Sequence, residues 1–175
     1  TFLELLNPYS ILVGITTVSL FMMHGAIYLV MKTEGALQSQ TRSWVNNTII
    51  FFTMCFVTTT MATLIYHPNM VNHFKEFPPF FLLAIITMLA IANIPREIHL
   101  GREFRAFLSS SATIAMLLVL FAIGIFPNLV LSNPNPEYSL NIYNAASSQK
   151  TLMTMLVMAI IGMPFVVTYT IIIQK

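Results

Sequence analysis

Five apolar runs separated by polar connectors divide the chain, at residues 9–31, 44–66, 79–95, 108–130 and 151–173. In hydrocarbon, every backbone amide and carbonyl needs a hydrogen-bond partner inside the protein, so an apolar run of about 20 residues must be helical. The pattern therefore predicts an all-α integral membrane protein whose five transmembrane helices form one transmembrane helical domain.

The connectors contain residues that are typical of turns, and the longest connector is expected at residues 131–150. It includes the run Asn133-Pro134-Asn135-Pro136. Within the last apolar run, Pro164 lacks a backbone N–H and is expected to kink the helix.

Lysine and arginine lie mostly on one side of the predicted bundle. The side with the first connector, the third connector and the C-terminus carries six of them: Lys32, Arg42, Arg96, Arg102, Arg105 and Lys175. The other side carries two, Lys75 and Lys150. Because cytoplasmic loops are enriched in basic residues, we expect the N-terminus outside and the C-terminus in the cytoplasm. The first run has no basic segment before it and is too long for a signal peptide, and the start at Thr1 suggests a piece of a longer polypeptide.

Composition excludes a soluble protein. Charged residues make up 8% of the chain, against about 25% in a soluble domain, and the mean hydropathy is +0.79. The net charge of +2 comes without a basic cluster, which argues against nucleic acid as a partner. The single cysteine, Cys55, excludes an intrachain disulfide and a cysteine-based metal cage.

One ionisable side chain, His24, lies well inside an apolar run, where such groups are often functional. It can ligate a haem or relay protons. The alternative is a hydrogen-bonded packing histidine beside Gly25, where a neighbouring helix can approach closely. No second histidine lies within an apolar run, since His67, His73 and His99 stand in connectors or at helix ends.

Charged residues at the helix ends also have two interpretations. Glu34, beside Lys32, either guards a proton entrance or is an interfacial charge that is paired locally. The third connector either binds an anionic lipid or sets the topology through local ion pairs. Its charged residues are Arg96, Glu97, Arg102, Glu103 and Arg105.

Threonines are frequent in the second apolar run, at Thr53, Thr58, Thr59, Thr60 and Thr63. Such a helix either lines a polar path or bonds its own backbone and packs against its neighbours. The sequence has no paired carboxylates, no nucleotide-binding loop and no cluster of metal ligands, so the residues by themselves predict no active site.

Two stretches resemble subunit II of the cytochrome bd quinol oxidases, including the cyanide-insensitive branch. The first helix and its exit read Asn7-Pro8, Gly14, His24-Gly25-Ala26, Tyr28-Leu29 and Lys32-Thr33-Glu34-Gly35. The last connector reads Ser139-Leu140, Tyr143-Asn144-Ala145, Ser147-Ser148-Gln149 and Thr151-Leu152. The resemblance extends from Leu6 to the end, with two departures: Tyr143-Asn144 replaces a Trp-Asp pair, and His24 varies in the family.

The resemblance implies a respiratory-chain enzyme of the bacterial inner (plasma) membrane that takes electrons from a quinol and reduces oxygen to water. It implies a four-helix transmembrane bundle plus one additional transmembrane helix, as the C-terminal half of subunit II. Haems b and d would lie in the partner, subunit I, and the acidic residues of a proton path in the N-terminal half of subunit II. This chain would scaffold subunit I without catalytic, cofactor-binding or metal-binding residues of its own, and a bound quinone or lipid stays open.

Nine motif positions are expected to have a structural or subunit-contact role: His24, Gly25, Lys32, Thr33, Glu34, Gly35, Ser147, Ser148 and Gln149. Gly35 permits a left-handed stop of the first helix, and Thr33 and Glu34 can bond exposed backbone groups. Ser147-Ser148-Gln149 is expected to cap the last helix or, alternatively, to contact subunit I.

The residues by themselves are compatible with two other functions. A small membrane transporter would explain the threonine-rich helix and Pro164, although neither an inverted repeat nor broken helices at the midplane are evident. A membrane haem protein would use His24 as a ligand, but the sequence offers no partner histidine.

Overall fold

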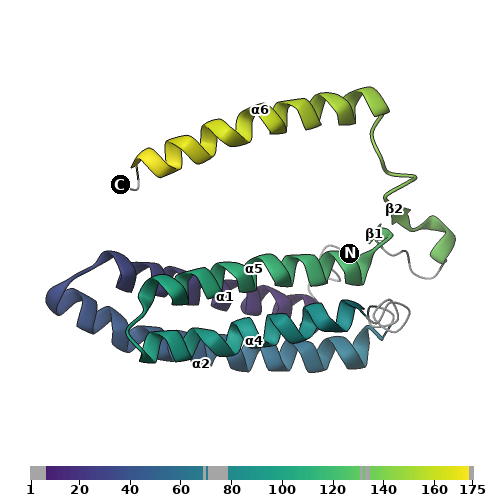
Figure 1. The fold of residues 1–175 in the computed structure, drawn as a ribbon. Coiled ribbons are helices and arrows are strands. Elements are labelled where there is room, and N and C mark those ends of the chain that lie inside the picture. Colours follow the sequence, from purple (N-terminus) through teal and green to yellow (C-terminus); the bar gives the residue numbers. More distant parts are fainter. Residues whose placement is uncertain (1–6, 69, 71–78, 131, 133–134, 174–175) are drawn as a thin grey trace. The chain divides into compact units, whose positions relative to one another are not determined.

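Five long helices make up most of the computed structural model, which describes residues 7–68, 70, 79–130, 132 and 135–173 (Figure 1). They are α1 (Pro8–Lys32), α2 (Gly35–Tyr66), α4 (Pro79–His99), α5 (Glu103–Ile125) and α6 (Gln149–Ile173). Each is long and apolar enough to cross a membrane. The chain is therefore a multi-pass membrane protein of the predicted all-α class, and it divides into two units, Thr1–Ile125 and Phe126–Lys175.

The first unit is a four-helix bundle. Helix α1 packs against α2 and α5, and α4 packs against α5 (Figure 1). Only Thr33 and Glu34 separate α1 from α2, and only Leu100–Arg102 separate α4 from α5. Such short turns make both pairs antiparallel neighbours and place the two turns at the same end of the bundle.

Local sequence explains where the helices of the bundle begin and end. The Asn7 side chain accepts a hydrogen bond of 2.7 Å from the Ser10 amide, and Pro8 occupies the first helical position. The second short turn contains Gly101 at a φ of +68°, where the Arg102 amide donates to the Glu97 carbonyl at 2.9 Å. A left-handed glycine with this bond is a common helix stop.

The core of the bundle lies near the end that carries the two short turns. Helices α1, α2 and α4 each contribute buried apolar residues at spacings of three and four, the spacing of one helical face. These residues are Met23, Ile27 and Val30; Val45, Ile49 and Phe52; and Ile91, Ile94 and Ile98. Ala106 adds a small buried side chain from α5, which lets the neighbouring helices approach.

Helix α2 begins nine residues before its predicted start, at Gly35 instead of residue 44. Hydropathy detects only the apolar part of a helix, and the residues of the first turns are polar but compatible with helix. At about 1.5 Å per residue, the 32 residues of α2 exceed a hydrocarbon core of about 30 Å. The first turns of α2 therefore extend beyond the apolar layer.

Other helix ends also differ from the sequence pattern, and α5 begins at Glu103, five residues before its predicted start. Helix α4 continues past Pro95 to His99, because a proline near a helix end removes only one backbone hydrogen bond. Helix α5 ends at Ile125, not at residue 130, and Pro127 follows two residues later.

The second unit contains a short pair of strands and then α6. Strand β1 (Asn128–Val130) pairs antiparallel with β2 (Leu140–Asn141), with Asn128 opposite Asn141, and the 3₁₀ turn η2 (Pro136–Tyr138) precedes β2. The sequence pattern predicted neither strand: it included residues 128–130 in the fourth helix and expected turns in the connector at 131–150. Helix α6 continues through Pro164, so the predicted kink remains a prediction.

Some residues named above lie outside the described part of the chain. They are Thr1, Leu6, His73, Lys75, Asn133, Pro134 and Lys175.

Replacing Phe52 by alanine tests the packing of the bundle. Phe52 is fully buried, so Phe52→Ala should lower the free energy of unfolding by about 3 kcal/mol through the cavity that it leaves. The matched control is Phe51→Ala, because the adjacent Phe51 is 43% exposed. The measurement is denaturant unfolding of the purified protein in detergent micelles, and equal losses for both variants would contradict the described core.

Candidate functional site

The half-buried histidine of α1 lies in an aromatic and hydroxyl environment at the contact with α5. His24 Nδ1 is 2.8 Å from the Ser110 hydroxyl, and its ring stacks on Phe107 with 4.9 Å between the ring centres. Tyr28, one helical turn further along α1, also contacts Phe107. One ring nitrogen and one ring face are thus used in helix packing, which favours the packing interpretation of His24 over a ligand or proton relay.

The close helix approach expected at Gly25 does not occur in the described part of the chain. Gly25 is exposed, and a Cβ atom placed on it would meet nothing within 4 Å. Within the described chain, the small residue faces away from the contact that His24 makes, and its expected role in subunit contact stays a prediction.

The exit of α1 is shaped by the motif that begins at Lys32. The Thr33 hydroxyl and amide both donate to the Leu29 carbonyl, at 2.7 and 3.0 Å. Gly35 has a φ of +66°, the left-handed conformation considered for it, but as the first residue of α2. Glu34 precedes it and forms no side-chain cap to α2. These contacts account for the local turn, while any role in subunit contact stays a prediction.

Serine and asparagine side chains organise the last connector and the start of α6. The Ser148 hydroxyl accepts from the Thr151 amide at 3.4 Å and lies 2.9 Å from the Thr151 hydroxyl, which is the geometry of an N-cap. Before it, the Asn144 side chain accepts from the Asn141 amide at 2.7 Å and donates to the Ser139 carbonyl at 2.9 Å. Asn144 thus holds together the turn that follows β2.

The threonines of α2 are used in packing. Thr53, Thr58 and Thr60 each donate to the carbonyl four residues earlier, at 2.8 Å. Across the contact with α1, the Thr59 hydroxyl lies 2.6 Å from that of Thr16, and the Thr63 hydroxyl lies 2.9 Å from that of Tyr9. These contacts join α1 to α2 and favour the packing interpretation over a polar path.

An ion pair joins α2 to α5 near the two short turns of the bundle. Arg42 of α2 pairs with Glu103 of α5, which is not one of the local ion pairs that were one interpretation of the third connector. No pattern in the sequence marks Arg42 as this partner, because the two residues are 61 positions apart. The pairing depends on α2 beginning early enough to include Arg42 in its first turns.

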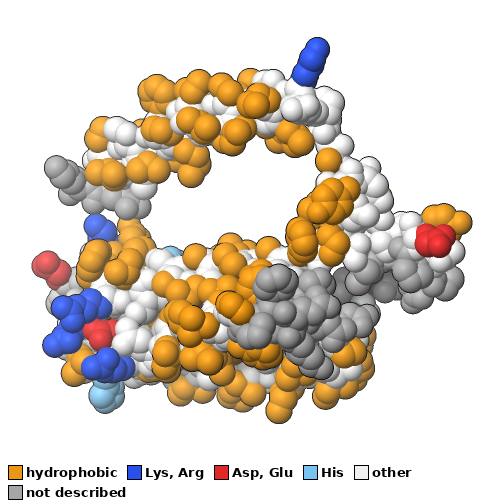
Figure 2. Space-filling view, turned by 45° about the vertical axis from the view of Figure 1, so that its right-hand side comes forward, with side chains coloured by type: hydrophobic (Ala, Val, Ile, Leu, Met, Phe, Trp, Pro, Cys, Tyr) orange, Lys and Arg blue, Asp and Glu red, His pale blue; other side chains and the backbone are white. Residues whose placement is uncertain are grey.

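The neighbouring carboxylate of α4 points inward. Glu97 is 4% exposed, and among the described residues its Oε2 has no hydrogen-bond partner. The three arginines of the same connector, Arg96, Arg102 and Arg105, are exposed. Figure 2 shows basic side chains gathered at this end of the bundle. The end therefore presents mainly positive charge.

Metal ligands are not brought together in the part of the chain that the structure describes. No group of three or more His, Cys, Asp or Glu side chains could hold a metal ion there. The described arrangement is thus one of helix contacts and turn contacts, with one charged end.

The amino-acid sequence matches known proteins over nearly its whole length. The family model of the cytochrome bd terminal oxidase subunit II matches residues 1–174. The chain is 29% identical to the probable cytochrome oxidase subunit 2 of Haemophilus influenzae, over 98% of this chain and 52% of that relative. It is 26% identical to the cytochrome bd-I ubiquinol oxidase subunit 2 of Escherichia coli K12, over 97% of this chain and 52% of that relative. The cytochrome bd ubiquinol oxidase subunit 2 of Bacillus subtilis is 28% identical to the chain, over 94% of this chain and 48% of that relative. The chain spans about half the length of these relatives.

Separate and combined replacement of Arg42 and Glu103 tests the link between the turns. The pair is partly exposed, so we expect a coupling free energy of about 0.5–1 kcal/mol between Arg42→Ala and Glu103→Ala in a double-mutant cycle. The matched control cycle combines Arg42→Ala with Arg105→Ala. Arg105 is an exposed residue on the same helix as Glu103, so the two losses should be additive. Denaturant unfolding of the purified protein measures both cycles, and additivity in the Arg42–Glu103 cycle would show that the pair contributes nothing.

Proposed function

We propose a function for this chain from one premise: it belongs to the cytochrome bd terminal oxidase subunit II family. The chain is part of a membrane complex that oxidises a quinol and reduces oxygen. Within it, the chain is a non-haem structural part that packs beside subunit I, and haems b and d belong to that partner. The match of the family model along residues 1–174 is the observation that carries this proposal.

The polar side chains of the bundle support a structural role. The contacts of His24 with Ser110, Thr16 with Thr59 and Arg42 with Glu103 each join two helices. Interhelical hydrogen bonds in membranes contribute about 0.6 kcal/mol each, so several are needed to hold a bundle in one arrangement. A scaffold uses its few polar groups in this way.

Helix α6 supports contact with a protein partner or with lipid. Apolar side chains occur all around this helix. A helix that is apolar on all sides is buried in a protein or in a membrane. We assign part of this surface to contact with subunit I. The N-terminal half of subunit II is a second partner of the chain.

The resemblance of the motifs and the half-length matches support a place in the C-terminal half of a longer subunit II. The basic residues support an orientation in the bacterial inner membrane with the two short turns in the cytoplasm. In that orientation the Ser147-Ser148-Gln149 motif lies outside.

Isolation of the native complex through an affinity tag on this chain tests the proposed function. We expect a haem-bearing membrane subunit to co-purify, with an optical haem spectrum and quinol-dependent oxygen uptake. A chain that purifies alone, without colour, and moves a solute across vesicle membranes would contradict the oxidase assignment and favour a transporter.

The variant His24→Phe tests whether this chain ligates a haem. Phenylalanine can keep the stacking on Phe107, so the helix packing should be preserved. Because the proposal gives His24 no haem to ligate, the haem spectrum per complex should be unchanged. Tyr28→Phe, in the same aromatic group, is the matched control. Loss of haem absorbance in His24→Phe alone, with unchanged subunit composition, would make His24 a ligand and contradict the proposal.

Single-cysteine labelling tests the orientation. In a Cys55→Ala background, Ser147→Cys should react with a membrane-impermeant maleimide in intact spheroplasts, because its connector is proposed to face outside. The matched variant Ser39→Cys, also at an exposed serine, should react only after the membrane is opened. The reverse pattern would invert the orientation.

A further inference from the structure

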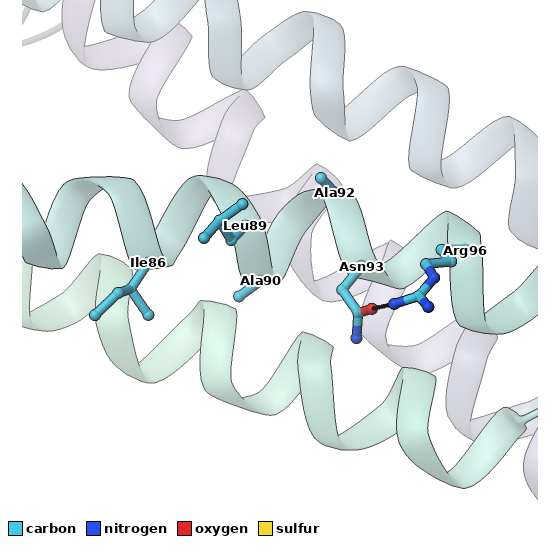
Figure 3. A pocket seen from close by; sticks show the side chains of 6 residues that line it. All are labelled: Ile86, Leu89, Ala90, Ala92, Asn93 and Arg96. Atoms are coloured by element: carbon cyan, nitrogen blue, oxygen red, sulfur yellow. Dashed lines mark hydrogen bonds between the residues drawn. The ribbon is translucent and has the colours of Figure 1, made fainter.

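A groove runs along one face of α4 and changes from apolar to polar toward the end of the helix. It is an open hollow of about 500 Å³ on the surface of this one helix, and Leu89 in its lining is 63% exposed. Its lining residues, shown in Figure 3, are Ile86, Leu89, Ala90, Ala92, Asn93 and Arg96. The four apolar residues come first along the helix, and the small side chains of the two alanines leave the space open.

The polar end of the groove is held by a chain of hydrogen bonds. Asn93 Nδ2 donates to the Ser109 hydroxyl on α5 at 2.8 Å, which fixes the amide. Its Oδ1 accepts from Arg96 Nη1 at 3.5 Å, as the dashed line in Figure 3 shows. This long bond leaves most of the five donors of the exposed Arg96 guanidinium available to a ligand.

The charges around this end favour an anion. Of the two carboxylates in the connector, Glu103 is paired with Arg42 and Glu97 is buried. No described carboxylate forms an ion pair with Arg96, Arg102 or Arg105, and all three are exposed. Arg96 is thus an exposed basic residue in the groove itself, and Figure 2 shows further basic side chains at this end of the bundle.

We propose that the α4 groove binds an anionic phospholipid, with an acyl chain along Ile86–Ala92 and the phosphate at Arg96. Arg102 and Arg105 add attraction for the negative headgroup, as basic clusters at the ends of membrane helices do. A free phosphate would leave the apolar part of the groove unused, and a neutral amphiphile would leave the arginines unused. This inference goes beyond the proposed function and does not depend on it.

Native mass spectrometry of the purified complex that contains this chain tests the site. Phosphatidylglycerol and phosphatidylcholine with identical acyl chains are titrated in detergent, and the retained lipid is counted. One arginine near a membrane surface contributes enough for Arg96→Gln to weaken phosphatidylglycerol binding at this site about fivefold. Phosphatidylcholine binding should change little.

Two further variants separate the site from general effects. Ala92→Phe fills the apolar part of the groove and should also weaken phosphatidylglycerol binding, without removing a charge. Lys150→Gln removes one positive charge at the start of α6 and should leave the binding as in the unaltered complex. The same spectra report subunit composition, so a variant that fails to assemble is recognised. If either Arg96→Gln or Ala92→Phe fails to assemble, phosphatidylglycerol binding by the other of the two tests the proposal.

Three results would overturn the proposal. The first is equal retention of phosphatidylglycerol in Arg96→Gln, Ala92→Phe and Lys150→Gln. The second is phosphatidylcholine binding as tightly as phosphatidylglycerol in the unaltered complex, and the third is displacement of the lipid by millimolar inorganic phosphate alone, which would make the site one for free phosphate.

Discussion

The need of every backbone amide and carbonyl for a partner inside hydrocarbon is the constraint on which the rest of this structure depends. It makes each apolar run a helix and confines turns, strands and almost all charges to the ends of the helices. It also means that burial of apolar surface does little to hold the helices together, because lipid is as apolar as the side chains. Association depends instead on close packing around residues such as Phe52 and on a small number of polar contacts.

Those polar contacts join helices of the described bundle. His24 contacts Ser110 and Phe107, and the hydroxyls of Thr16 and Thr59 meet across α1 and α2. Side chains used in this way hold helices at a set distance, which suits a subunit that packs beside a catalytic partner. The same contacts weigh against a polar path along α2, because a path needs hydroxyls that face water.

The end of the bundle with the two short turns is tightly packed. The end with the short turns holds the buried apolar residues, the Arg42–Glu103 pair and the inward-facing Glu97. Pairing and burial of these carboxylates leave Arg96 and its neighbours as the charges that face outward. The packing of the interior thus determines the electrostatic character of the surface, and with it the kind of lipid that the α4 groove is proposed to bind.

The amino-acid sequence by itself determined the all-α membrane class, the number of long apolar helices and the family resemblance, because hydropathy and motif order are local properties. It also indicated the left-handed glycine at Gly35 and the serine cap before α6. It did not predict the early start of α2, whose first turns are polar, or the paired strands after α5. Only the tertiary structure decided that Arg42 meets Glu103 and that Gly25 faces away from its neighbours. These outcomes depend on which faces of four helices meet, and residues that lie 61 positions apart carry no mark of one another in the sequence.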